Sequence, residues 1–410
     1  MAIVFREVQI EHLCSKVTSG STPLRSRADF YDGGTIDWYK TGELKDWYLE
    51  PADERITERA LKETSVKLFP ANTVLMAMYG DGKTITSMGM LRAPAATNQA
   101  CSAMLVDEAK CDPRYFFYAL KGRRDLLLKV ASGGAQRNLS GKLIKEFHLP
   151  VPPLPIQRRI AGILSAYDEL IENSQRRIKI LEAMARALYR EWFVHFRFPG
   201  HESVPRVPSP LGEIPQGWEV RPFTEIADVL SGGTPKTDIA EYWNGEIPFF
   251  TPRDAPDCFY VQDADKHVTE LGLSKCASAL YSPDTVFITA RGTVGKVALP
   301  SVPMAMNQSC YALRGKAGVT QRYLFLLTLQ QVDYLKTNTG GATFDTIVVD
   351  TFRRMQIVIP PRAVIAHFTE TVDSMFEAVN TLQRQIQTLR HTRDLLLPRL
   401  LSGQIALQEH

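Results

Sequence analysis

The sequence has few cysteines and no long hydrophobic runs, and both shortages limit what the chain can be. Its six cysteines, at positions 14, 101, 111, 258, 276 and 310, form no Cys-x-x-Cys pair and have no histidines at zinc-site spacing. No apolar stretch reaches the roughly 18 residues of a membrane-spanning helix. The charged N-terminal segment lacks a signal-peptide core. We therefore expect a soluble cytoplasmic protein without disulfides.

Catalytic motifs are also lacking. Lys83-Thr84 follows a glycine, but the first glycine of a P-loop is replaced by Ala77. Neither of the two Pro-Pro pairs has the flanking residues of an amino-methyltransferase motif. Asp257 and the Asp263–Lys266 run hint at a metal nuclease, yet alanine stands at the place of one carboxylate. A non-enzyme is favoured, and a nuclease with a cryptic metal site is the alternative.

The charge balance is close to neutral. A net charge of +3 over 410 residues does not by itself indicate a nucleic-acid binder. Between Lys121 and Glu146, however, seven lysines and arginines face only two acidic residues. This basic window predicts either a solvated helix face or a patch that follows phosphates.

What the sequence does contain is a long repeat. Five motifs recur in the same order, 207 to 212 residues further on. The motif pairs are Ser19–Pro23 with Ser231–Pro235, Ile56–Glu58 with Val268–Glu270, Asn98–Cys101 with Asn307–Cys310, Ser132–Ala135 with Thr339–Ala342, and Pro152–Pro153 with Pro360–Pro361. Two copies are too few for a solenoid, so we expect two similar modules related by an approximate two-fold axis.

Each copy begins with a module that mixes strands and short helices. Val74–Met78 and Val286–Thr289 predict matched buried strands, each preceded by a turn. Tyr115–Val130 and Arg322–Leu335 predict matched amphipathic helices. Cys101 and Cys310 predict buried thiols in equivalent strands. The mixture indicates an α/β or α+β module.

A long helix follows each module. In the first copy the apolar residues fall at Ile160, Ile163, Tyr167, Leu170, Leu181, Met184 and Leu188. In the second they fall at Val372, Met375, Val379, Leu382, Ile386, Leu389, Leu396 and Leu400, with Arg393 as the one polar member. This spacing predicts coiled-coil helices, and a two-fold axis would make the pair antiparallel. Five prolines predict that residues 198–217 form a linker that is neither helix nor central strand.

The matched glycine-containing basic loops are the first candidates for contact with nucleic acid. Glycines let backbone N–H groups approach a phosphate, and a neighbouring cation adds attraction. The alternative is a hairpin turn with solvated side chains. The candidates are Tyr79, Asp81, Lys83 and Thr84 in the first module and Arg291, Thr293 and Lys296 in the second.

A second pair of matched loops shares two glycines, at positions 133–134 and 340–341, but differs in the tip residues that follow them. The first tip holds Gln136, Arg137 and Asn138, residue types that pair with the edges of adenine and guanine. The second tip holds Thr343 and Phe344 at the matching place. One scaffold with different tips is what two different half-sites require. The alternative is that both loops are plain turns.

Further candidates follow the shared Ser-Gly turn and a pair of aromatic strands. Thr22, Arg25, Thr234 and Lys236 either bind phosphate or cap local structure, and Lys40 and Arg253 lie beside the aromatic residues. We expect Trp38, Tyr39, Phe249 and Phe250 to pack in cores. The amides of Asn98-Gln99 and Asn307-Gln308 are expected to be buried and structural, because both halves share them.

These motifs together resemble a known family. The run Leu149–Ile160 leading into a long helix and the run Leu211–Trp218 opening the second half are the most specific features, beside the repeated turns and Asn-Gln pairs. Over nearly its whole length the chain resembles the DNA-specificity subunit of Type I restriction–modification systems. The second helix departs from the pattern, since Arg362–Phe368 replaces the Pro-Ile-Gln-Arg-Arg-Ile run.

The resemblance implies an architecture. It implies an α+β protein in which two α/β target recognition domains, related by pseudo-two-fold symmetry, are separated by an antiparallel coiled coil. The expected parts are target recognition domains at 1–154 and 218–361, long helices at 155–197 and 362–410, and the linker at 198–217.

The resemblance also implies a function. Each domain would read one half of a bipartite, asymmetric DNA site, and the chain would catalyse nothing itself. Expected partners are double-stranded DNA, two copies of an adenine-N6 methyltransferase subunit and an ATP-dependent restriction subunit. The chain would hold no cofactor, with S-adenosylmethionine and ATP on the partner subunits. An orphan subunit that acts as an adaptor or inhibitor is a further alternative.

Overall fold

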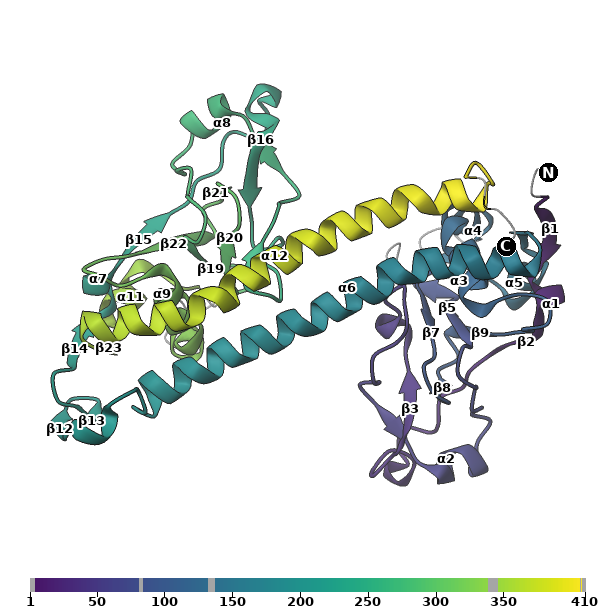
Figure 1. The fold of residues 1–410 in the computed structure, drawn as a ribbon, viewed down its shortest axis with the longest axis horizontal. Coiled ribbons are helices and arrows are strands. Elements are labelled where there is room, and N and C mark those ends of the chain that lie inside the picture. The colour runs from purple at the N-terminus through teal and green to yellow at the C-terminus, as the bar shows by residue number, and fades with distance from the viewer. Residues whose placement is uncertain (1–3, 81–83, 132–136, 338–345, 406, 408–410) are drawn as a thin grey trace. The chain divides into compact units, whose positions relative to one another are not determined.

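A computed structural model describes residues 4–80, 84–131, 137–337, 346–405 and 407 of the chain (Figure 1). Its contacts divide the chain into two compact units. The first unit comprises Met1–Ile171 with Thr388–His410, and the second comprises Glu172–Gln387. Each unit therefore contains one of the repeated modules together with part of each long helix.

The first module alternates short strands with short helices. Its strands are β1 (Arg6–Gln9), β2 (Cys14–Ser19), β3 (Ile36–Tyr39), β4 (Arg55–Ile56), β5 (Val74–Ala77), β6 (Tyr79–Gly80), β7 (Met88–Met90), β8 (Ala96–Thr97), β9 (Cys101–Val106), β10 (Arg137–Asn138) and β11 (His148–Val151). Its helices are α1 (Ile10–Leu13), α2 (Glu58–Glu63), α3 (Pro113–Gly122), α4 (Arg124–Val130) and α5 (Gly141–Glu146).

Two sheets organise this module. One is antiparallel, in the order β2-β9-β5-β7, and the other is mixed, in the order β4-β3-β8, with β3 parallel to β8. Two strand pairs, β1 with β11 and β10 with β6, complete the set. Within this unit, β3 and α2 lie at the end of the module away from α6 (Figure 1).

The second module repeats the plan. Its strands are β14 (Glu219–Pro222), β15 (Ala227–Ser231), β16 (Trp243–Phe250), β17 (Tyr260–Val261), β18 (His267–Val268), β19 (Val286–Thr289), β20 (Val297–Pro300), β21 (Ala305–Met306), β22 (Cys310–Gly315) and β23 (Gln356–Ile359). Its helices are α7 (Phe223–Ile226), α8 (Glu270–Ser274), α9 (Gln321–Gln330), α10 (Val332–Thr337) and α11 (Val349–Arg354). The sheet orders β15-β22-β19-β20-β17 and β18-β16-β21 match those of the first module, with β17 added.

The matched apolar runs become central strands, as predicted. Every residue of β5 and of β19 is buried, because each strand has a neighbour on both sides. The turns before them are also matched, since Asn72 and Asp284 both adopt a left-handed conformation with φ of 63°. Asn and Asp tolerate this conformation better than other residues with a side chain. Cys101 and Cys310 begin the equivalent strands β9 and β22 and are fully buried.

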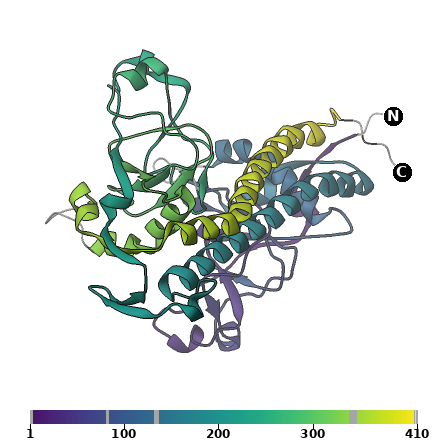
Figure 2. The same ribbon diagram turned by 60° about the vertical axis from the view of Figure 1, so that its left-hand side comes forward.

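The long helices are α6 (Leu154–Tyr189), continued by a π-helical turn at Arg190–Val194, and α12 (Arg362–Leu401). Within each unit, the parts of the two helices that belong to it lie side by side in both views (Figures 1 and 2). In the first unit Asp168 of α6 pairs with Arg393 of α12. In the second unit the ring of Tyr189 lies 6.0 Å from that of Phe368. Within the second unit the ring of Trp192, beyond Tyr189, stacks on that of His367, which precedes Phe368, so the helices are antiparallel.

The buried stripe of α6 differs from the predicted one. Leu170 and Met184, expected in the seam, are 55% and 49% exposed. The predicted Ile160 is buried, but the other buried residues lie mostly one position beyond the predicted ones, at Leu164, Ile171, Ile178, Ala185 and Tyr189. The sequence carries two adjacent apolar stripes on this helix, and periodicity alone does not say which one faces the partner. In α12 the predicted residues Val372, Val379, Leu382, Ile386 and Leu400 are buried.

One further expectation needs correction. The predicted helices at 115–130 and 322–335 are each two helices, broken at Arg123 and at Gln331.

The proline-rich segment after α6, which the structure describes throughout, contains no α-helix and no central strand. It forms a short 3₁₀ turn (His201–Ser203) and a hairpin of β12 (Arg206–Ser209) and β13 (Gly212–Pro215). Prolines fit there because both strands of a two-stranded hairpin are edge strands.

The fold class is therefore the predicted one: two similar α/β modules and a pair of long antiparallel helices. The last turns of α12 enter the core of the first unit, where Leu397, Leu400 and Leu401 pack with residues of α3 and with Ile160 of α6.

Candidate nucleic-acid interface

The repeated Ser-Gly turn is a place where two backbone segments touch. A Cβ atom on Gly20 would lie 2.0 Å from the carbonyl oxygen of Thr97, and one on Gly232 would lie 2.2 Å from that of Asn307. Such distances exclude any side chain, so glycine is required at both positions. The contact holds the turn against the segment that carries the Asn-Gln pair in each module.

A matched hydrogen bond joins the same two segments. The hydroxyl of Thr22 donates to the amide oxygen of Gln99 at 2.5 Å, and the hydroxyl of Thr234 donates to that of Gln308. Thr22 and Thr234 were candidates for phosphate binding or for capping local structure. Their hydroxyls are engaged with these amides.

The expectation that the Asn-Gln amides are buried was wrong for the glutamines. Gln99 and Gln308 are exposed, whereas Asn98 and Asn307 are half-buried. Each asparagine side chain accepts a hydrogen bond from the backbone two residues on, at 3.1 Å and 3.0 Å, and so closes a local turn. The asparagines are structural, and the glutamines stand at the surface.

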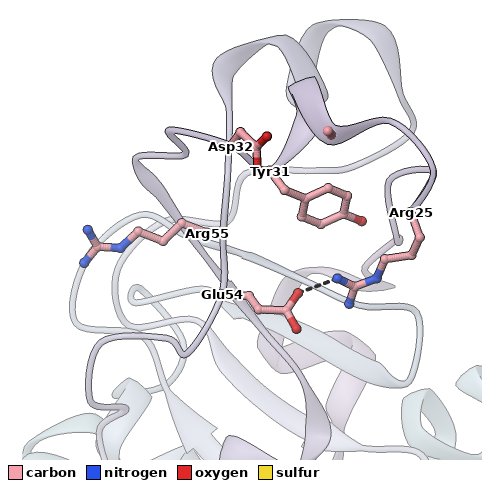
Figure 3. Close-up of a pocket in the computed structure, with 6 residues that line it drawn as sticks. Arg25, Tyr31, Asp32, Glu54 and Arg55 are labelled. Atoms are coloured by element: carbon pink, nitrogen blue, oxygen red, sulfur yellow. Dashed lines mark hydrogen bonds and ion pairs between the residues drawn. The ribbon is translucent and has the colours of Figure 1, made fainter.

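Arg25 and Lys40 meet on one carboxylate. Glu54, next to β4, accepts from Arg25 Nη1 through Oε2 at 2.5 Å (Figure 3). Its Oε1 accepts from Lys40 Nζ, also at 2.5 Å. The Lys40 ammonium and the Arg25 guanidinium lower the pKa of the Glu54 carboxyl. The predicted residues Arg25 and Lys40 thus form one site with Glu54, a residue that was not among the predicted candidates.

Two aromatic rings pack against the Arg25 side chain of this site. The Arg25 guanidinium carbon is 4.8 Å from the ring centres of both Tyr31 and Trp38. Tyr31 Oη donates to the carbonyl of Pro23 at 2.7 Å, and this hydrogen bond joins Tyr31 to the Ser19–Pro23 turn. Burial raises the pKa of Tyr31. Trp38 is only 1% exposed, so it belongs to the core as predicted.

An open depression of about 470 Å³ lies in front of these groups, lined by Arg25, Ala28, Tyr31, Asp32, Glu54 and Arg55 (Figure 3). The side chains of Arg25 and Glu54 point toward each other across it. Arg55 points to the opposite side, where its guanidinium Nε donates to Asp37 at 2.9 Å.

The second module places different residues on the same backbone. The backbone N–H of Trp38 donates to the carbonyl of Glu54, and that of Phe249 donates to the carbonyl of Lys266, at 3.0 Å and 2.8 Å. Lys266 therefore occupies the position of Glu54, and its ammonium lies 5.6 Å from the ring centre of Trp243. Phe249 is equivalent to Trp38, so Thr251, two residues after Phe249, corresponds to Lys40, two residues after Trp38.

The glycine-containing basic loops are only partly described. Tyr79 and Thr84 are half-buried, whereas Asp81 and Lys83 lie outside the described residues. In the second module Arg291 and Thr293 are exposed, and Lys296 forms an ion pair with Asp257, whose side chain is 92% exposed. Thr289 donates its hydroxyl hydrogen bond to the carbonyl of Thr293 and so closes this loop.

The loops with different tips fall largely outside the described residues. This applies to Gln136, Thr343 and Phe344 and to the side chain of Arg137. Asn138 is exposed in β10, where it pairs with Tyr79 of β6. The predicted candidates Asn138 and Tyr79, from separate loops, are thus neighbours. Lys236 and Arg253 are both exposed in the second module.

In the basic segment between Lys121 and Glu146, two of the arginines form ion pairs with acidic residues from elsewhere in the chain. Arg123 pairs with Glu7 at 2.5 Å, and Arg124 pairs with Asp46. Both acids lie outside the segment in the sequence, so a local count misses them. The prediction of a phosphate-following patch is weakened here.

The hint of a metal nuclease finds no support in the described part of the chain, where no three His, Cys, Asp or Glu residues lie close enough to hold a metal ion. Asp265 instead donates its backbone N–H to Asp254 at 2.9 Å, and Asp263 pairs with His267 at 3.0 Å.

Comparison with known families agrees with this duplicated arrangement. The sequence model of the family described as Type I restriction modification DNA specificity domain matches residues 5–183 and 215–388. These stretches contain the two modules and most of both long helices. The chain belongs to this family.

Relatives within the family align over most of their length. The MjaIX specificity subunit of Methanocaldococcus jannaschii is 27% identical over 96% of this chain and 92% of its own. The HindI specificity subunit of Haemophilus influenzae is 23% identical over 64% of this chain and 70% of its own. The crystal structure of a Type I S subunit from M. genitalium has the same fold, with a TM-score of 0.61 over 97% of this chain and 96% of its own at 16% identity. Among the described residues, no helix is both long and apolar enough to cross a membrane.

Proposed function

We propose that the chain is the DNA-reading specificity subunit of a Type I restriction–modification complex and that it catalyses no reaction itself. In this proposal each module reads one half of a bipartite, asymmetric duplex site. Family membership supports the general role. The observation that carries the two-half reading is that one scaffold is built twice with different exposed residues.

The contrast between scaffold and surface is specific. The glycine contact, the Thr–Gln hydrogen bond and the Asn turn are the same in both modules. At the edge of the β3 and β16 sheets, however, Lys40 and Glu54 in the first module correspond to Thr251 and Lys266 in the second. Phosphate contacts fix a protein on DNA, and differing side chains at base edges read sequence. Two different surfaces on one scaffold suit two different half-sites.

The proposed partners are double-stranded DNA, two copies of an adenine-N6 methyltransferase subunit and an ATP-dependent restriction subunit. S-adenosylmethionine and ATP would bind those subunits. An exposed apolar face on α6 supports contact with a partner helix, since Ile180 and Met184 are 59% and 49% exposed and lie four residues apart.

The test is to express the chain in a host with a cognate methyltransferase subunit and map N6-methyladenine across the genome. The proposal expects one bipartite motif with methylation on both strands. Co-purification with the methyltransferase subunit separates this function from that of an orphan adaptor. Methyl transfer or DNA cleavage by the purified chain alone would show an enzyme instead.

A further inference from the structure

We propose that Arg25 and Lys40 form a clamp for a single DNA phosphate, and that Glu54 occupies this clamp until a phosphodiester group displaces it. Glu54 would therefore lower the affinity of the first module for any duplex. The inference rests on the proposed function, because the ligand it names is the DNA backbone.

The geometry of the carboxylate is that of a bridging anion. Its two oxygens each accept from a different cation, at 2.5 Å from Arg25 Nη1 and 2.5 Å from Lys40 Nζ. A phosphodiester presents two non-bridging oxygens in a similar fork and forms charge-assisted hydrogen bonds to the same donors. The Glu54 carboxylate thus stands in for the phosphate that the two cations are placed to bind.

The clamp is held in position before any ligand arrives. The rings of Tyr31 and Trp38 support the Arg25 guanidinium, and a cation stacked on aromatic rings loses less freedom on binding. Lys40 follows directly after β3, and its backbone N–H donates to Glu43 at 2.7 Å. The Arg25 guanidinium and the Lys40 backbone are therefore both held in place.

The site is also accessible. The side chains of Arg25, Lys40 and Glu54 are 52%, 36% and 33% exposed. Ion pairs at this exposure are weak and screened by salt, so an incoming phosphate can replace the carboxylate. The open depression in front of Arg25 and Glu54 leaves room for it (Figure 3).

The fold does not require an acid at this position. The second module makes the same backbone hydrogen bond with Lys266 in place of Glu54. A positive charge there is compatible with the same pair of sheets. The negative charge of Glu54 is therefore a property of the first module's surface, where it opposes the binding of phosphate.

The experiment measures the affinity of the full chain for a mixed-sequence duplex of about 30 base pairs, roughly three helical turns, over a range of salt concentrations. Glu54→Gln should tighten binding roughly threefold to tenfold at low salt, the size expected from releasing two exposed ion pairs. The dependence on salt should keep its slope, because the same phosphate is bound in both proteins.

The variant Arg25→Ala/Lys40→Ala should bind more weakly and lower the salt slope by about one, because both cations serve one phosphate. A drop of about two would mean two separate phosphates and would overturn the clamp. This variant also decides the matter if circular dichroism shows that Glu54→Gln fails to fold.

Asp37→Asn is the matched control. It removes the same charge from the same sheet and frees Arg55, which points away from Arg25 (Figure 3). We expect its affinity to stay close to that of the wild type. Equal tightening by both variants would show an effect of net charge alone, and no tightening by Glu54→Gln would show that the clamp does not bind DNA. If the wild-type chain binds no duplex at low salt, the proposed function itself is wrong.

Discussion

Asp168 on α6 and Arg393 on α12 lie 225 residues apart in the sequence and form an ion pair inside the first unit. Their side chains are 4% and 11% exposed, and Tyr118 Oη donates to the same carboxylate at 2.6 Å. Arg393 is the one polar residue in the apolar pattern of α12. The Asp168 carboxylate on α6 neutralises its charge. Because a buried charge must meet its partner, the pair specifies which residues of the two helices face each other.

Removing one member of this pair should strongly destabilise the first unit. Arg393→Met leaves the Asp168 carboxylate buried without its counter-charge, at an expected cost of about 3–5 kcal/mol in the free energy of unfolding. Thermal melting followed by circular dichroism measures the loss.

Two controls make this prediction specific. Lys142→Ala removes the exposed pair with Glu146 in α5 and should change stability by less than about 1 kcal/mol. Replacing Tyr118, Asp168 and Arg393 together by Phe, Leu and Met should recover most of the lost stability. A mild effect of Arg393→Met alone would mean that the pair is not buried in solution.

The repeated glycines give a second prediction. Gly20→Ala and Gly232→Ala each drive a methyl group into a backbone carbonyl and should destabilise the protein by about 1–3 kcal/mol. Gly162→Ala is the control. Gly162 lies inside α6, and a Cβ atom added there meets no atom of the described residues within 4 Å outside the backbone of its own helix turn. It should stabilise the helix by about 0.5–1 kcal/mol. If all three variants melt alike, the close backbone contact is absent.

The repeat itself predicted much of this fold. Buried strands at Val74 and Val286 and buried thiols at Cys101 and Cys310 could be predicted because apolar runs and small residues recur at matched places. The seam of α6 could not, since Leu170 and Met184 are as apolar as the residues that face the core. Which stripe is buried depends on α12, more than 200 residues away.

The candidate site shows the same limit. Arg25 and Lys40 could be selected from their place beside repeated motifs, but their shared partner Glu54 could not. It lies 29 and 14 residues from them, and only the strand pairing of β3 and β4 brings it near. Aligning the two copies from Thr57 and Thr269 would have set Glu54 against Lys266 and marked the position as different.

The buried thiols predict a loss of stability at high pH. Burial raises the pKa of Cys101 to about 12 from an ordinary value of 9.0. The folded state therefore keeps the proton while the unfolded state loses it. Stability should be unaffected below pH 9 and fall between about pH 9 and 12, by up to about 1.4 kcal/mol per pH unit for each such thiol.

Chemical denaturation at pH 8 and pH 10 measures this effect, and Cys101→Ala should reduce the difference. In the folded protein at pH 8, Cys101 and Cys310 should resist alkylation and react only after denaturant is added. Rapid labelling of either thiol in the native protein would show that strands β9 and β22 open readily.

Lys296 provides a prediction in the second module. Its ammonium pairs with the highly exposed Asp257 and remains available to a phosphate. Lys296→Ala should weaken binding to all duplexes and lower the salt slope by about one. Lys316→Ala is a matched control, since Lys316 pairs with Asp228 at 2.7 Å and is 39% exposed against 40% for Lys296. A loss of sequence discrimination with an unchanged slope would mean that Lys296 reads bases.

The most direct test of the two-module account is an exchange of one module. Residues 1–150 are replaced by the matching segment of a family member with a different target, chosen to keep the apolar residues of α3 that meet Leu397 and Leu401. The chimaera is expressed with the methyltransferase subunit, and N6-methyladenine is mapped across the genome. The account predicts that one half of the methylated motif changes and the other half stays as in the wild type. A change in both halves, or in neither, would contradict it.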